Sequence, residues 1–318
     1  MVGNILGWLL FVVLAVLFGW LVRRAWRAKN AILKWVGVVL SGLLTLVFLA
    51  VSVVILIGLV KLYSPRNVTV PDLSVPLTPE NIARGEHLAN SFCTSCHSPT
   101  NELPLIGGLD LAKDIPIPLG SFVSRNLTPG GPLKDYTDGE IFNVLRNGIN
   151  PQGRVLVFMS TVRARNMSDE DTQAVIAYLR SQPAVDNPTL DPPDQPNLLA
   201  VFLSGAGMLP EGKPPTTGVI TAPPKGPTVE YGEYIIGYQD CRDCHGEDLK
   251  GGKPGQLAPI GWNLEMVKNW TAEQFITTMR TGVDPNGYEI KPVMPWQAIG
   301  RMDDIELTAM HAYLVSLP

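Results

Sequence analysis

The four cysteines of this 318-residue chain fall in two copies of one short pattern, in which two cysteines three positions apart are followed at once by a histidine. The two copies are Cys93-Thr-Ser-Cys96-His97 and Cys241-Arg-Asp-Cys244-His245. Residues at positions i, i+3 and i+4 of a helical turn lie on one side of it, so two thioether bonds and one imidazole can reach the same porphyrin. C-x-x-C-H is the attachment signature of a c-type haem. We therefore predict two covalently bound haem c groups, attached through the four cysteines.

Two other uses of paired cysteines fit this pattern less well. Disulfides between the motifs would leave the adjacent histidines unexplained, and a zinc site would require four ligands from one compact unit. Two of the four histidines directly follow the cysteine pairs, and we predict that His97 and His245 bind iron. The other two, His87 and His311, are expected to be structural.

An internal repeat surrounds the two motifs. The matching segments are 84–89 with 231–236, 136–148 with 270–282, 150–153 with 284–287, and 167–179 with 302–314. Gly85 and Gly232 occupy equal positions in the repeat, which suggests a close crossing between the first and last helices of each copy. The chain therefore contains one haem-binding unit twice, each built from a few helices around one cofactor.

The repeat aligns two pairs of methionines that could supply the sixth iron ligand. Met159 and Met294 each precede the tyrosine of the last segment by 19 residues and lie in irregular sequence, from which a loop can reach the far face of a haem. Met167 and Met302 lie 11 residues before the same tyrosines, next to helix-capping patterns. Packing against the porphyrin edge fits the second pair better than ligation. We therefore predict Met159 and Met294 as metal ligands, whose soft thioethers favour ferrous iron and raise the potential.

The N-terminal sequence contains two uncharged apolar runs, residues 4–22 and 35–60. Each can cross about 30 Å of hydrocarbon as a helix. The segment 23–34 between them carries five Lys and Arg residues, which by the positive-inside rule stay cytoplasmic. A cleaved signal peptide would need basic residues before the first run rather than after it. We therefore predict a two-pass anchor in the inner membrane, with the N-terminus and the haem domains on the periplasmic side, where haem c is attached.

Charge is distributed unevenly along the chain. Residues 1–62 hold six basic and no acidic residues, whereas the remainder holds 19 basic and 29 acidic residues, a formal net charge of −10. Because no basic stripe exists outside the apolar N-terminus, nucleic acid is not expected as a partner.

A proline-rich segment separates the two copies of the repeat. Eleven prolines lie within residues 183–228, which predicts a semi-rigid, extended connector. Its apolar stretch Leu198–Leu203 is too short to span a bilayer and is expected to dock on a haem unit or on the membrane surface. The expected organisation is an anchor over 1–63, a first haem domain over 64–182, the linker over 183–228 and a second haem domain over 229–318.

The chain resembles the membrane-associated multihaem class I cytochromes c, and in particular the cytochrome subunits of membrane-bound alcohol, aldehyde and gluconate dehydrogenases. The motifs that carry the resemblance are Gly85-Glu, the first C-x-x-C-H, Pro118-Leu-Gly120, Asn126-Leu-Thr-Pro129, Tyr136-Thr-Asp and Asp169-Glu-Asp…Ala177-Tyr-Leu179-Arg. The resemblance implies the class I cytochrome c fold, haem ligation and electron transfer. Together with the apolar runs, it leads us to expect an all-α chain, with an N-terminal two-helix transmembrane hairpin followed by two tandem class I cytochrome c domains. Those subunits usually carry three haem motifs and a C-terminal anchor, whereas this chain has two motifs and an N-terminal hairpin.

These observations favour a non-catalytic electron-transfer subunit. It would move electrons between a membrane or extracytoplasmic donor and an acceptor, inside a larger respiratory or photosynthetic complex whose other subunits contact the hairpin. The alternative is a catalytic dihaem enzyme of the peroxidase or thiosulfate-oxidising type. That alternative needs an open sixth position on one haem, and a methionine at both aligned positions counts against it.

Overall fold

The computed structural model describes residues 1–113 and 115–318. The chain divides into two compact units. The hairpin unit contains residues 1–66, 112–122 and 194–211, and the repeat unit contains residues 67–111, 123–193 and 212–318.

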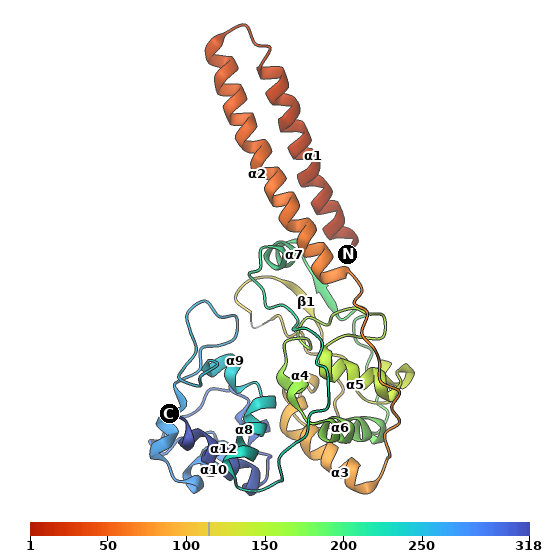
Figure 1. Ribbon diagram of the computed structural model, residues 1–318, viewed down its shortest axis with the longest axis vertical. Helices are drawn as coiled ribbons and strands as arrows, with labels where there is room; N and C mark the ends of the chain where they lie inside the picture. The colour runs from red at the N-terminus through yellow and green to blue at the C-terminus, as the bar shows by residue number, and fades with distance from the viewer. Residues whose placement is uncertain (114) are drawn as a thin grey trace. The chain divides into compact units, whose positions relative to one another are not determined.

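Two long antiparallel helices, α1 (Val2–Ala25) and α2 (Ala31–Tyr63), form the hairpin (Figure 1). The side chain of Asn30 caps α2 by accepting hydrogen bonds from the backbone N–H groups of Ile32 and Leu33. Most large apolar side chains of both helices point outward and are exposed. Both helices are long and apolar enough to cross a membrane.

A short helix of the proline-rich segment, α7 (Leu198–Gly205), packs against α2 inside the hairpin unit. A Cβ atom added to Gly58 would lie 1.9 Å from the carbonyl oxygen of Val201, and one added to Gly205 would lie 1.9 Å from that of Val54. The apolar stretch that was expected to dock on a haem unit or the membrane surface therefore packs on α2, because glycine in both helices lets their backbones approach. Just before α7, β2 (Asp194–Pro196) pairs antiparallel with β1 (Gly120–Phe122).

Among the described residues, the regular elements of the repeat unit are helices and helical turns, joined by long loops. The first repeat contains α3 (Pro79–Leu88), the π-helical turn η1 (Ala89–Cys93), α4 (Thr94–His97), η2 (Pro132–Asp135), α5 (Asp138–Asn147), η3 (Arg163–Asn166) and α6 (Asp169–Ser181). The second repeat contains α8 (Val229–Tyr238), α9 (Cys241–His245), η4 (Leu264–Asn269), α10 (Ala272–Thr281), α11 (Trp296–Ile299) and α12 (Asp304–Ser316). The all-α prediction is confirmed, with the two short strands as the exception.

The first and last helices of each repeat cross at a glycine. A Cβ atom added to Gly85 in α3 would lie 1.8 Å from the carbonyl oxygen of Ala174 in α6. One added to Gly232 in α8 would lie 1.9 Å from that of Ala309 in α12. The close crossing suggested by the repeated glycine is therefore confirmed in both copies. The capping patterns before α6 and α12 also form as predicted, with side-chain caps at Ser168 and Asp303.

The end of the proline-rich segment lies along the first repeat. The Arg165 guanidinium donates to the carbonyl oxygen of Pro214 at 2.6 Å and to Oγ1 of Thr216 at 2.7 Å. Further on, the carbonyl oxygen of Ile220 accepts from the backbone N–H of Asp169 at 2.9 Å. These hydrogen bonds hold residues 214–220 against the first repeat.

Candidate haem centres

The cysteines and the histidine of each motif share one helical segment, as their spacing predicts. Cys93 ends the π-helical turn η1, and α4 continues from Thr94 to His97. In the second repeat, α9 contains the whole motif from Cys241 to His245. The four cysteines are partly buried and form no disulfide with one another.

A backbone carbonyl orients the imidazole of each motif. Nδ1 of His97 lies 3.0 Å from the carbonyl oxygen of Arg125, and Nδ1 of His245 lies 2.6 Å from that of Trp262. A carbonyl oxygen only accepts hydrogen bonds, so Nδ1 carries the proton and Nε2 keeps its lone pair.

Both imidazoles are uncharged and can offer the lone pair of Nε2 to a metal. Burial lowers the pKa of His97 and of His245, although the hydrogen bond to the carbonyl oxygen acts in the opposite direction. Each motif therefore offers two thiols and one neutral, oriented imidazole. This set fits haem c, because a ligating histidine generally donates its other ring N–H to a fixed acceptor.

The loops that carry the predicted methionine ligands begin in the same way in both repeats. Gly148 caps the C-terminus of α5 and Gly282 that of α10, each in the left-handed conformation, with φ of 64° and 71°. The carbonyl oxygen of Gly148 then accepts from the N–H of Leu156 at 2.8 Å, and that of Gly282 accepts from the N–H of Ile290 at 2.7 Å. Each hydrogen bond closes a loop that contains the turn, Asn-Pro-Gln-Gly in the first repeat and Asp-Pro-Asn-Gly in the second.

The two aligned pairs of methionines occupy different environments. Met159 and Met294 are partly exposed and follow the turns in irregular backbone. Met167 and Met302 are each 1% exposed and belong to the hydrophobic core. The second pair therefore packs in the hydrophobic core, and axial ligation by Met159 and Met294 stays a prediction.

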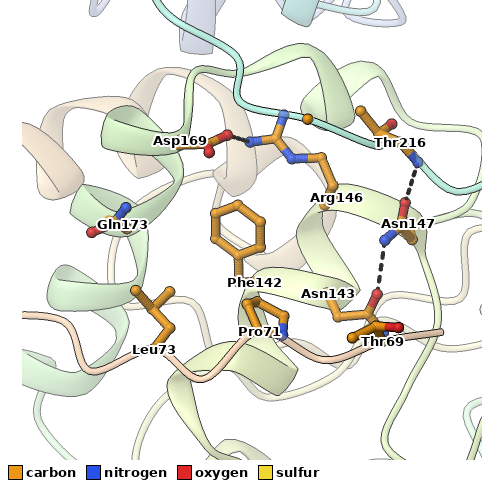
Figure 2. A pocket seen from close by; sticks show the side chains of 11 residues that line it. Thr69, Pro71, Leu73, Phe142, Asn143, Arg146, Asn147, Asp169, Gln173 and Thr216 are labelled. Carbon is orange, nitrogen blue, oxygen red and sulfur yellow. Dashed lines mark hydrogen bonds and ion pairs between the residues drawn. The ribbon is translucent and has the colours of Figure 1, made fainter.

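An arginine near the end of α5 fixes the chain between Met159 and α6. Arg146 donates to the carbonyl oxygens of Arg165 and Met167, both at 2.7 Å, and forms an ion pair with Asp169 at 2.7 Å. Figure 2 shows this guanidinium bonded to Asp169 and near the ring of Phe142, whose centroid lies 5.0 Å from Cζ of Arg146. These bonds tie the end of α5 to the start of α6.

The second repeat uses an arginine in the same way. Arg280 of α10 donates to the carbonyl oxygens of Gly300 at 2.5 Å and Met302 at 2.9 Å, and pairs with Asp304 at 2.9 Å. The sequence repeat is thus also a repeat of the contacts that support each haem loop.

The two repeats meet through equivalent residues. His87 aligns with Tyr234, and Asp171 aligns with Glu306. Nε2 of His87 lies 2.5 Å from Oε2 of Glu306, and the Tyr234 hydroxyl donates to Oδ2 of Asp171 at 2.6 Å. Each repeat therefore places the same α3 or α8 position against the same α12 or α6 position of the other. His87 and His311, whose Nε2 lies 2.9 Å from the Trp270 carbonyl oxygen, both have protein partners.

Arg84 joins the two carboxylates of this interface. Its Nε donates to Oδ1 of Asp171 at 2.8 Å, and its Nη1 donates to Oε1 of Glu306 at 2.9 Å. Burial alone would raise the pKa of Glu306, but hydrogen bonds from His87 and Arg84 and the charges of His87 and Lys225 outweigh it and lower that pKa to about 2. Sequence reasoning did not identify this network. The signal that could have indicated it is the repeat alignment, in which His87 pairs with Tyr234 and Asp171 with Glu306.

The helical units and their two oriented C-x-x-C-H segments define a c-type cytochrome with two haems. Residues 80–179 match the family model described as cytochrome c oxidase, cbb3-type, subunit III, and residues 229–318 match the family model of cytochrome c. The chain is thus a dihaem cytochrome c with two cytochrome c domains. It carries two covalently bound haem c groups, and Cys93, Cys96, Cys241 and Cys244 belong to their attachment motifs.

Curated relatives match parts of the chain. A dihaem cytochrome c-type protein of Cereibacter sphaeroides is 32% identical over 115 residues, 35% of this chain and 38% of the relative. The fructose dehydrogenase cytochrome subunit of Gluconobacter japonicus is 25% identical over 107 residues, 28% of this chain and 21% of the relative. The alcohol dehydrogenase (quinone) cytochrome c subunit of Gluconobacter oxydans is 28% identical over 100 residues, 27% of this chain and 21% of the relative. The match thus spans about a fifth of the length of the two dehydrogenase subunits.

Proposed function

We propose that this dihaem cytochrome c is the electron-transfer subunit of a membrane-bound redox complex. Each haem supplies a one-electron Fe(III)/Fe(II) couple. In this proposal His97 and Met159 bind the first iron, and His245 and Met294 bind the second. The names of two relatives, both cytochrome subunits of dehydrogenases, support a partnership with a dehydrogenase or a comparable donor.

The main support for electron transfer is the similarity of the two predicted haem sites. Both motifs present a neutral imidazole whose Nδ1–H is bound to a carbonyl oxygen, at 3.0 Å in the first repeat and 2.6 Å in the second. The two sites share further contacts, because Arg146 and Arg280 make equivalent hydrogen bonds after each methionine loop. A catalytic dihaem enzyme needs two unlike centres, one of which leaves iron open to substrate.

Spectroscopy of the purified holoprotein during a redox titration tests this function. We expect two low-spin haems that both show the charge-transfer band of a ferric haem with a thioether ligand. A high-spin haem that binds cyanide or peroxide readily would contradict electron transfer and favour the catalytic alternative.

The proposal includes a two-pass topology. The helices α1 and α2 anchor the protein in the inner membrane, the loop with five basic residues faces the cytoplasm, and both haem domains are periplasmic. The proposed domains are 1–63, 64–182 and 229–318, with the linker over 183–228. Alkaline phosphatase fused after Pro318 should be active, and the same enzyme inserted after Lys29 should be inactive. The reverse pattern would contradict this orientation.

The hairpin also supports permanent membership of a complex. One helix is enough to tether a domain, so a second apolar helix offers additional surface for other membrane subunits. Purification in mild detergent, with identification of the proteins that remain bound, will show which donor or acceptor accompanies the cytochrome.

A further inference from the structure

An arginine of the first repeat binds the haem-attachment segment of the second. Arg163 lies four residues after Met159, and its side chain is 9% exposed. Its backbone N–H donates to Oδ1 of Asp240 at 2.8 Å, and its Nε donates to Oδ1 of Asp243 at 2.8 Å. Its Nη2 donates to Oε1 of Glu247 at 2.5 Å. Asp243 stands between the two cysteines of the second motif, so this guanidinium reaches the second haem site directly.

An arginine of the second repeat makes the reverse contact. Arg301 lies seven residues after Met294, and its Nη1 donates to the carbonyl oxygen of Asn90 and to Oγ1 of Thr94, both at 3.0 Å. Thr94 is fully buried between the two cysteines of the first motif. The first haem site is therefore contacted by the segment that follows the predicted methionine ligand of the second.

The repeat relates these contacts to one another. Asn166 is the position of the first repeat that aligns with Arg301, and Gly237 aligns with Asn90. Nδ2 of Asn166 donates to the carbonyl oxygen of Gly237 at 2.7 Å. The segment after the predicted methionine ligand of each repeat thus contacts the haem-attachment region of the other repeat. In each of these two contacts an arginine contributes a positive charge.

We propose that the positive charges of Arg163 and Arg301 each raise the reduction potential of the haem in the opposite repeat. A positive charge beside a haem disfavours the oxidised state, whose net charge is more positive by one. Arg163 offsets the carboxylates of Asp243 and Glu247 beside the second motif, and Arg301 adds positive charge beside the first. The proposal rests on the proposed electron-transfer function and predicts that each domain tunes the haem of its neighbour.

Potentiometric titration of the full-length holoprotein tests the crossed assignment. In Arg163→Gln the second haem should become easier to oxidise. At the wild-type midpoint its ratio of oxidised to reduced form should rise roughly tenfold, which corresponds to about 59 mV for a one-electron couple. Arg301→Gln should do the same to the first haem. A larger shift in the haem of the mutated repeat itself, or no shift in either haem, would overturn the proposal.

Opposite charge changes at one contact separate electrostatics from folding. Asp243→Asn breaks the same ion pair as Arg163→Gln but removes a negative charge, so it should raise the potential of the second haem. Arg163→Lys keeps the charge and should retain most of the wild-type potential. A structural effect alone would move the Asp243→Asn and Arg163→Gln variants in the same direction, and that result would contradict the proposal.

Matched controls come from the arginines whose bonds stay inside one repeat. Arg146→Gln and Arg280→Gln remove the same charge, and each should shift mainly the haem of its own repeat. The two titration waves are assigned with Met294→His, which should lower only the wave of the second haem, since an imidazole replaces the thioether. If that variant moves neither wave, the ligand proposal fails, whereas the crossed effect still requires that Arg163→Gln move the same wave as Arg280→Gln and that Arg301→Gln move the other. Haem content and far-UV circular dichroism confirm that each variant is loaded and folded.

Discussion

The proton on Nδ1 of His97 and His245 decides which ring nitrogen is available to iron. In both repeats this proton is held by a carbonyl oxygen that lies outside the motif, 28 residues after His97 and 17 residues after His245. The two aligned pairs of methionines likewise differ in their local environment. Met167 and Met302 are enclosed by the core, whereas Met159 and Met294 lie in partly exposed loops.

Replacement of one methionine tests the ligand assignment. Met159→Ala should abolish the thioether charge-transfer band of one haem and leave that of the other. Met167→Ala should keep both bands and instead lower stability, by about 2–5 kcal/mol for a buried methionine. Absorption spectra of the oxidised proteins provide the measurement. Loss of a band in Met167→Ala alone would show that the register between the repeats was misassigned.

Acid should weaken the interface between the repeats through Glu306. The pKa of this carboxyl is about 2 in the folded protein, below its ordinary value of 4.5. A lowered pKa stabilises the folded state above pH 4.5, and this contribution is lost as the pH falls from 4.5 toward 2. The difference corresponds to about 3 kcal/mol.

Denaturant unfolding between pH 6 and pH 3 measures this effect. Glu306→Gln should be less stable than the wild type at pH 6, and the gap between the two should narrow as the pH falls. Glu170→Gln on the exposed start of α6 serves as the control and should follow the wild type. A constant gap between Glu306→Gln and the wild type at all pH values would contradict the assignment.

At the scale of elements, each cytochrome c domain depends on the crossing of its first and last helices. Gly85 and Gly232 allow α3 to touch α6 and α8 to touch α12 at backbone distance. Glycine also governs the hairpin unit, where Gly58 of α2 and Gly205 of α7 bring those helices together.

Two glycines of the same helix provide a matched test. In Gly232→Ala the new Cβ would lie 1.9 Å from the Ala309 carbonyl oxygen, and we expect a loss of about 1–3 kcal/mol as α8 and α12 separate. Gly237 of α8 has no atom within 4 Å of an added Cβ. Gly237→Ala should therefore be neutral or stabilise by up to about 1 kcal/mol, because alanine favours helix. Equal effects of the two substitutions, measured by thermal unfolding, would contradict the close crossing.

At the scale of the whole molecule, charge is segregated from hydrophobicity. Residues 1–62 hold the two long apolar helices and six basic residues, whereas residues 63–318 carry a formal net charge of −10. Such a field attracts cationic partners over long distances and is screened by salt.

The salt dependence of haem reduction tests this field. The rate of reduction by a small cationic donor should fall by roughly tenfold between low and high ionic strength. The rate of oxidation by an anionic acceptor such as ferricyanide should rise over the same range. Stopped-flow mixing of the detergent-solubilised protein with each reagent measures both. Rates that do not depend on salt would show that the net charge has no influence at the haem edges.

Much of the architecture could be predicted because its signals are local. The C-x-x-C-H spacing lies within about one helical turn, and the capping residues Ser168 and Asp303 act on N–H groups three positions away. The glycine pair at 85 and 232 was informative because the same residue occurs at the same place in both copies. The motif spacing and the caps depend on residues close together in the chain, whereas the glycine crossings were suggested by the repeat.

The C-x-x-C-H spacing and the internal repeat were enough to predict where haem is attached and that the haem unit occurs twice. Only the folded chain reveals which carbonyl oxygens orient His97 and His245, that α7 packs on α2, and that each repeat contacts the haem motif of the other. His87 and Glu306 are separated by 219 positions, and Arg301 and Thr94 by 207. No local propensity relates such residues, because their contact follows from how folded helices pack rather than from the conformation of either segment.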